Sequence, residues 1–119
     1  MVLGVLTKLH HLKWCHCDLR WPNIVYTYDG NAPLLIDFEY ARKIGDPVPR
    51  DLKIIDGQIK NNKWDSQADV YQVGQMIITS NFAKDEDKRI AVELTLEKRS
   101  NAAELLDALR KLGGDWVLP

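Results

Sequence analysis

The 119-residue sequence contains no long apolar run and carries little net charge. Its uninterrupted hydrophobic stretches are far shorter than the ~18–20 residues that cross a bilayer. The formal net charge is -1, and no run of like charges is present that would attract nucleic acid or an anionic membrane. We therefore expect no membrane-spanning segment, no membrane partner and no nucleic-acid partner.

Cysteine is also scarce. Cys15 and Cys17 are two residues apart, a spacing that is poorly suited to a disulfide between them. Residues 1–12 lack the cleavage pattern of a secretory signal. Both features favour a reducing, intracellular compartment, either cytoplasmic or nuclear. The remaining composition, 45% hydrophobic and 28% charged, is typical of one globular domain.

Apolar residues recur at helical spacing in four places. The first is residues 1–13, where an amphipathic helix is expected to bury one stripe. A second helix, residues 68–78, is apolar on nearly every side and should be central, and residues 85–96 suit a shorter helix. In the last helix Asn101 and Glu104 form a capping box, and Gly113 and Gly114 would end it. The expected stripes of the first and last helices are Val2, Val5, Leu6, Leu9 and Leu12, and Leu105, Leu106, Leu109 and Leu112.

Between the first two helices the periodicity changes. Residues 24–26 and 34–36 are short β-type runs, and the turn residues 29–31 between them indicate a hairpin. Residues 45–63 show no sustained period, which predicts an irregular segment. The expected fold class is thus mainly α (α+β), with one small β-hairpin near its N-terminal end.

The hairpin carries an unusual set of polar residues. Asp18 and Asn23 precede its first strand, and Asp37 directly follows its second, so the hairpin can bring all three to one end. An Asn amide and an Asp carboxylate suit Mg²⁺, which prefers oxygen ligands and often shares them with phosphates. A separate carboxylate could accept a proton from an attacking hydroxyl. Arg20 would place a positive charge beside a transferring phosphoryl group.

These residues follow the order of a protein-kinase signature. The stretch HCDLRWPN resembles the catalytic loop H-R-D-L-x-x-x-N, and Asp37-Phe38-Glu39 stands where D-F-G would be. ADVYQVGQMI resembles the central helix of the C-terminal lobe, and EKRSNAAELLDAL resembles its closing helix. The sequence of the loop also resembles that of atypical kinase-like domains of fungi and of crinkler-type effectors. The resemblance covers almost the whole chain.

The resemblance implies a protein-kinase-like C-terminal lobe without its N-terminal lobe. Its parts would be the helix 1–13, the catalytic loop and metal-binding hairpin 14–40, an activation-like segment 41–65 and a helical core 66–119. The implied cofactors are ATP and Mg²⁺, and the implied partner is a protein substrate. The catalytic group would be Asp18 as base, with Arg20 and Asn23, and Asn23 and Asp37 would bind the cofactor metal, with Glu39 adding a carboxylate. His16 would hold the loop, and Asp69 would anchor it.

Several residues differ from that pattern. Cys17 replaces the arginine that usually pairs with a phosphorylated activation loop, and residues 41–65 contain no Ser, Thr or Tyr. We therefore expect any activity to be independent of phosphorylation in that segment. Glu39 replaces a glycine and removes its backbone freedom. No Gly-rich loop, strand lysine or helix glutamate precedes the site, so we expect either a fragment of a longer kinase or a lobe that binds another ligand.

Three other interpretations compete with this one. Glu39 also suits a small-molecule kinase of the aminoglycoside or choline type, although the helix of Asp69 and the closing helix disfavour it. A catalytically inactive pseudokinase or interaction module would keep the fold, and its exposed apolar face could support self-association. A metal cluster of His10, His11, Cys15, His16 and Cys17 lacks an established zinc spacing, and we expect both cysteines to be buried side chains.

Overall fold

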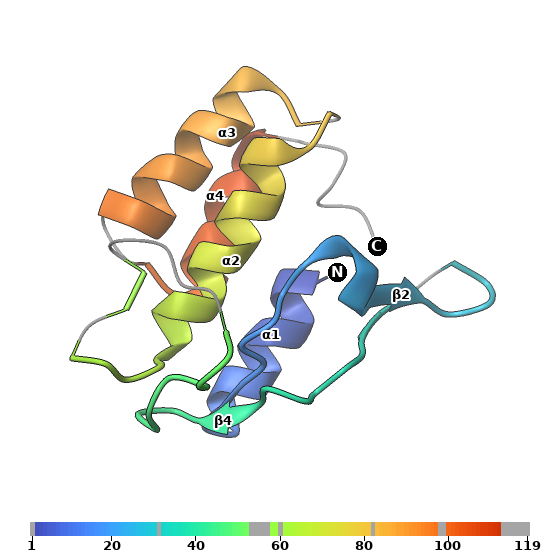
Figure 1. The fold of residues 1–119 in the computed structure, drawn as a ribbon. Coiled ribbons are helices and arrows are strands. Elements are labelled where there is room, and N and C mark those ends of the chain that lie inside the picture. Colours follow the sequence, from blue (N-terminus) through green and yellow to red (C-terminus); the bar gives the residue numbers. More distant parts are fainter. Residues whose placement is uncertain are drawn as a thin grey trace.

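A computed structural model describes residues 2–30, 32–52, 58–59, 61–81, 83–97 and 100–112. The fold is mainly helical, with two small antiparallel sheets, in agreement with the expected α+β class. Figure 1 shows α2, α3 and α4 side by side, with α1 and the strands on the other side of α2. The elements in chain order are α1 (Val2–His11), β1 (Trp14–Cys15), the 3-10 turn η1 (Trp21–Asn23), β2 (Ile24–Tyr26), β3 (Pro33–Leu35), β4 (Arg42–Lys43), α2 (Ser66–Thr79), α3 (Asp85–Val92), the π-helical turn η2 (Glu93–Glu97) and α4 (Ala102–Leu112).

Helix α2 is the central element, as its apolar sequence predicted. Asp65 caps its first turn, because its side chain accepts a hydrogen bond from the backbone N–H of Ala68 at 2.9 Å. Gly74 lets η2 approach closely, since a Cβ at this position would lie 2.5 Å from the Thr95 hydroxyl oxygen. The residues that α2 buries are Ala68, Asp69, Val70, Tyr71, Val73, Gly74, Met76 and Ile77.

Helix α1 packs against α4, but its buried stripe differs from the expected one. Leu3 and Leu6 are fully buried, whereas Val5 is only half-buried. Leu12 was wrongly placed in the stripe, because α1 ends at His11 and the Leu12 side chain is 69% exposed. The helix ends one residue too early for the 3.6-residue period to bring Leu12 back to the core.

The C-terminal half follows the sequence pattern closely. The capping box of α4 is present, with the N–H of Glu104 donating to Asn101 Oδ1 at 2.8 Å and the N–H of Asn101 donating to Glu104 Oε1 at 3.3 Å. Leu105, Leu106 and Leu109 are buried. Leu112 was wrongly assigned to this stripe, since it lies at the helix end and is 37% exposed. Gly113 and Gly114 lie outside the described residues.

The predicted hairpin is present, and a second sheet accompanies it. In the hairpin, β2 pairs with β3 so that Ile24 faces Leu35 and Val25 faces Leu34. The expectation of a single small hairpin was incomplete, because β1 pairs with β4 through Trp14 and Lys43. This pairing joins two-residue strands far apart in the chain, and so short an element leaves no alternating pattern in the sequence.

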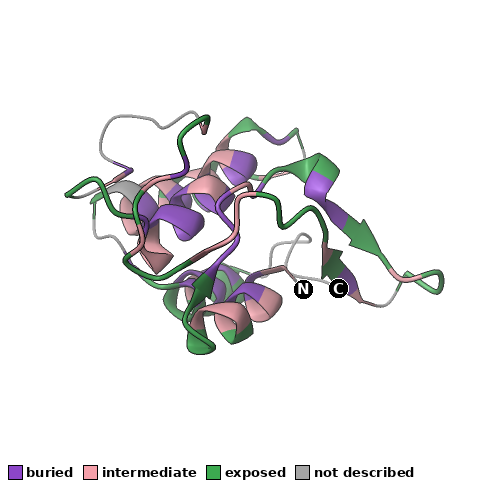
Figure 2. Ribbon diagram, turned by 60° about the horizontal axis from the view of Figure 1, so that its bottom comes forward, coloured by how far each residue is buried: buried purple, intermediate pink, exposed green. Residues whose placement is uncertain are grey.

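The two faces of the hairpin differ in burial. Ile24 and Pro33 are buried against the body of the protein, and Leu35 packs against the main core. The opposite face carries Val25 and Leu34, which are 38% and 48% exposed. Figure 2 shows the hairpin reaching away from the helices with mostly exposed positions. Among the described residues, nothing covers this apolar face of the hairpin.

The segment between β4 and α2 is irregular, as expected. Its described part contains one isolated bridge, between Pro47 and Lys63, and Trp64 is fully buried at its end. Residues 53–57 and 60 lie outside the described residues. In the part of the chain that the structure describes, none of the helices combines the length and apolarity needed to cross a bilayer.

Candidate functional site

Asp69, on the first turns of α2, holds the loop that follows β1. Its side chain is fully buried. Oδ2 accepts from the backbone N–H of His16 at 2.8 Å, and Oδ1 accepts from the backbone N–H of Cys17 at 2.9 Å. The indole N–H of Trp64 also donates to Oδ1, at 3.0 Å, and the ring of His10 donates to Oδ2 at 2.8 Å. Four donors therefore compensate the buried carboxylate, and the predicted anchoring role of Asp69 is confirmed.

Gln72, one turn further along α2, holds the same loop. Its Oε1 accepts from the backbone N–H of Leu19 at 2.9 Å, and its Nε2 donates to the carbonyl of Cys17 at 2.9 Å. Cys17 lies in the left-handed region, with φ 72°, which is unfavourable for a residue other than glycine. The hydrogen bonds from Asp69 and Gln72 fix this conformation from both sides of the residue.

His16 links the loop to the second strand of the hairpin. Its Nε2 bonds to the carbonyl of Ile36 at 2.8 Å, and its Nδ1 lies 3.2 Å from the backbone nitrogen of Asp18. A carbonyl only accepts and an amide N–H only donates, so these partners select the neutral ring with the proton on Nε2. The ring also meets Phe38 edge to face, with centroids 4.8 Å apart. His16 is therefore a buried structural histidine, as expected.

The predicted base, Asp18, sits in contact with two other predicted residues. The side-chain amide of Asn23 donates to Asp18 Oδ2 at 3.0 Å and to the Asp18 carbonyl at 2.8 Å. Arg20 Nε lies 3.4 Å from Asp18 Oδ1, with the arginine side chain 62% exposed. Asn23 is buried and belongs to η1, whose Pro22 favours the turn. The structure thus brings Asp18, Arg20 and Asn23 together.

Asp37 is carried to the same end of the hairpin by strand pairing. The backbone N–H of Ile36 donates to the carbonyl of Asn23 at 2.9 Å, so the residue before Asp37 lies beside Asn23. Asp37 itself has φ 62°, and its Oδ1 accepts from the N–H of Glu39 at 3.4 Å. Asp37 and Glu39 are exposed. Among the described residues, no hydrogen bond or ion pair joins their side chains to Asp18 or Asn23.

The two cysteines are free and fully buried, as expected. Burial raises the pKa of the Cys15 thiol well above its ordinary value of 9.0, and the neighbouring Asp69 carboxylate adds to the effect. Burial likewise raises the pKa of Cys17, with Asp69 contributing and Arg42 opposing. A thiol that stays protonated is a poor nucleophile and a poor metal ligand.

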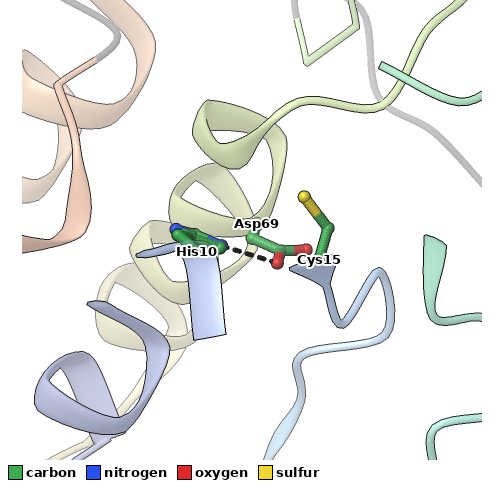
Figure 3. A group of neighbouring side chains, drawn as sticks. All are labelled: His10, Cys15 and Asp69. Atoms are coloured by element: carbon green, nitrogen blue, oxygen red, sulfur yellow. Dashed lines mark hydrogen bonds and ion pairs between the residues drawn. The ribbon is translucent and has the colours of Figure 1, made fainter. Parts of the chain in front are cut away.

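Figure 3 shows one group of potential metal ligands, the neighbouring side chains of His10, Cys15 and Asp69. The ligand atoms of His10, Cys15 and Asp69 lie within 4.8 Å of one another. Two of its members, His10 and Cys15, belong to the metal cluster considered in the sequence analysis. The other residues of that cluster, His11, His16 and Cys17, are not part of this group among the described residues. A metal here would have to replace the His10 proton and compete with three further donors to Asp69. We therefore interpret the group as a hydrogen-bonded anchor.

Comparison with known proteins gives one weak similarity. No protein-family model matches the chain. The chain is 29% identical over 90 residues to Crinkler effector protein 8 of Phytophthora infestans, a match that covers 71% of this chain. The chain corresponds to about 15% of the length of that relative. The match suggests a link to crinkler effectors and leaves the kinase resemblance unconfirmed.

Two residues that organise the site, Gln72 and Trp64, were not singled out from the sequence, and His10 was considered only as a metal ligand. All three make hydrogen bonds to the loop or to Asp69. Gln72 had a detectable signal, because it lies three residues after Asp69 and therefore on the same face of a helix. The other two come from separate segments, and only the tertiary structure shows that they meet at Asp69.

Proposed function

We propose that this chain is the C-terminal lobe of a protein-kinase-like phosphotransferase. In its complete form the site would transfer the γ-phosphoryl group of ATP to a protein hydroxyl. The single observation that carries this proposal is the buried Asp69, which fixes the backbone of the loop leading to Asp18. Phosphoryl transfer relies on positioning and electrostatics more than on covalent chemistry, so a firmly held base loop is what it requires.

In this proposal Asp18 accepts the proton of the attacking hydroxyl. One of its carboxylate oxygens is oriented by the Asn23 amide and the other by Arg20. These contacts limit the directions from which a hydroxyl can approach, and they leave Asp18 partly accessible to solvent. Arg20, whose Nε lies 3.4 Å from Asp18 Oδ1, can compensate negative charge on a transferring phosphoryl group.

The proposed metal ligands are Asn23, Asp37 and Glu39. Asn23 donates to Asp18 through Nδ2, which leaves its Oδ1 as an acceptor for a hard cation such as Mg²⁺. Asp37 and Glu39 offer exposed carboxylates on the adjacent strand end. Bound Mg²⁺ would supply charge neutralisation to the phosphates of ATP, and the chain contributes the ligands and the base loop.

The metal proposal can be tested on the chain itself. Mn²⁺ in place of Mg²⁺, added with ATP, should broaden the backbone NMR signals near Asn23 and Asp37. Asp37→Asn should abolish this local broadening, because it removes a negatively charged oxygen ligand. Asp51→Asn, which changes an exposed aspartate elsewhere, is the matched control and should leave it intact. Broadening centred on other carboxylates, or unaffected by Asp37→Asn, would contradict the proposal.

The rival functions call for a transfer assay. A protein kinase should phosphorylate peptide hydroxyls and lose that activity in Asp18→Asn, whereas a small-molecule kinase should prefer amino-alcohols. Glu39 is the observation that favours the small-molecule alternative, because it adds an exposed carboxylate that could bind an amine. An interaction module predicts no Mg·ATP-dependent thermal shift and a biological effect unchanged by Asp18→Asn. Its support is the uncovered apolar face of the hairpin.

The crinkler similarity bears on this proposal only in part. The sequence of the loop resembles crinkler-type kinase-like domains, and the relative found by comparison is named a crinkler effector. Its name says nothing of phosphoryl transfer. The chain corresponds to only a small share of that protein, so the activity and partners of a longer protein stay proposals.

A further inference from the structure

A pocket of about 600 Å³ is lined by residues that are neither proposed catalytic groups nor proposed metal ligands. It is formed where the last turn of α1 meets the first turns of α2 and α4. A volume of this size is within the range of small-ligand sites, about 300–1,000 Å³. The residues that line it are Thr7, Lys8, His10, His11, Leu12, Lys13, Ser66, Asn101, Ala102 and Ala103.

The ionisable side chains that line this pocket are all basic. Lys8, His10, His11 and Lys13 line the pocket, and no Asp or Glu does so among the described residues. Lys8 and Lys13 make no ion pair within the described part of the chain. Cations near the end of α1 also suit its helix dipole, but that does not account for Lys13, which lies beyond the helix.

Two helix N-termini face the same pocket. Ser66 is the first residue of α2, and Ala102 and Ala103 are the first residues of α4. The first N–H groups of a helix have no acceptor within it, and they carry partial positive charge. The carboxylates at these helix starts are engaged in capping, with Asp65 accepting from Ala68 and Glu104 accepting from Asn101.

His10 provides an independent observation that points to a ligand. Its side chain is only 10% exposed, yet it lines the pocket. Nε2 is bonded to Asp69, and the other ring nitrogen, Nδ1, has no hydrogen-bond partner among the described residues. Figure 3 shows that this second nitrogen lies on the side of the ring turned away from Asp69. A buried polar atom without a partner is unfavourable unless something else bonds to it.

From these observations we propose that the pocket binds a phosphate group, either free phosphate or the phosphoryl group of a small monoester. Lys8 and Lys13 supply the charge, and the N–H groups of α2 and α4 supply directed donors. His10 Nδ1 can accept from the P–OH group of a hydrogen phosphate. Leu12, Ala102 and Ala103 form an apolar wall that suits the organic part of a monoester. The pocket lining contains none of the proposed catalytic or metal-binding residues, although its His10 also bonds to the loop anchor Asp69.

The test is an NMR titration of the chain with inorganic phosphate and, separately, with O-phospho-L-serine. Saturable shifts of the backbone amides of Ser66, Gln67, Ala102 and Ala103 are expected. Sodium chloride at matched ionic strength should not produce them. Phosphate alone would identify free phosphate as the ligand, and binding of both would identify the monoester class. Shifts that do not saturate, or that chloride reproduces, would overturn the proposal.

Two double variants separate this site from general charge effects. Lys8→Gln with Lys13→Gln should weaken binding about tenfold or more, because two charge-assisted contacts are lost. Lys88→Gln with Lys111→Gln removes the same charge from residues outside the pocket lining and should leave the affinity unchanged. Equal weakening by both pairs would show that only the net charge matters, and the proposed site would be wrong.

Discussion

The loop of residues 15–19 and the hairpin of residues 24–36 carry adjacent parts of the candidate site, but they are held in different ways. The loop is fixed by buried polar side chains of α2, chiefly Asp69 and Gln72. The hairpin is held by its own strand pairing and by one apolar face, while Val25 and Leu34 stay exposed. The loop therefore depends on a few buried hydrogen bonds to α2, whereas the hairpin depends on its strand pairing and on one apolar face.

The strongest test of this difference is Asp69→Ala. It would leave the N–H groups of His16 and Cys17 and the indole N–H of Trp64 buried without an acceptor. We expect the free energy of unfolding to fall by about 3–5 kcal/mol, a large part of the stability of a domain of this size. Urea unfolding followed by circular dichroism measures the change.

The matched control is Asp107→Ala on the exposed face of α4. Within the described part of the chain Asp107 pairs only with Lys111, at 3.1 Å, and both side chains are exposed. The expected change is within about 0.5 kcal/mol. If Asp69→Ala cost no more than this control, the carboxylate would not hold the loop, and the main support for the proposed function would be lost.

Gln72→Ala should have the next largest effect. It removes one acceptor and one donor from a loop whose Cys17 lies at φ 72°, without leaving a buried charge unpaired. We expect a loss of about 1–3 kcal/mol in the same urea experiment. Gln75→Ala removes an equal side chain one turn further along α2 and should cost clearly less, since no hydrogen bond of that side chain is seen within the described residues.

The helical core was predictable because its signals are local. The capping box of Asn101 and Glu104 and the apolar run of α2 depend on residues within a few turns of each other. Errors arose at helix ends, because the apolar pattern continues to Leu12, which lies beyond α1, and to Leu112, the last residue of α4, and both are exposed. The pairing of β1 with β4 is nonlocal and very short, so no periodicity records it.

The candidate site was predictable to a similar extent. Spacing alone indicated that Asp18 and Asn23 lie together, and their hydrogen bond is present. The resemblance supplied Asp69 as an anchor, and its bonds to the loop are present as well. His10 and Trp64 could not be predicted as its partners, because each reaches Asp69 through the tertiary fold. The metal-binding roles of Asp37 and Glu39 stay predictions.

The pH dependence of stability tests whether the thiols of Cys15 and Cys17 in the loop are buried. Burial raises the pKa of Cys15 and Cys17 in the folded protein, so only the unfolded chain ionises as pH rises above 9.0. The stability present below pH 9.0 should therefore be lost progressively above it. Urea midpoints measured across this range should fall, and they should fall less steeply in Cys15→Ala. Rapid labelling of both thiols by an exposed-thiol reagent at pH 8 would contradict the burial argument.

The smallest effect on stability is expected at the outer face of the hairpin. Val25→Thr with Leu34→Thr places β-branched, strand-forming side chains at a cross-strand pair that is already exposed. The free energy of unfolding should change by no more than about 0.5 kcal/mol. The same change should reduce self-association, measured by sedimentation velocity over a range of protein concentrations, because an exposed apolar face favours contact between copies. A stability loss as large as that of Gln72→Ala would mean that this face packs against the protein itself. The proposed difference between the loop, which buried hydrogen bonds hold, and the hairpin, whose outer face is exposed, would then be wrong.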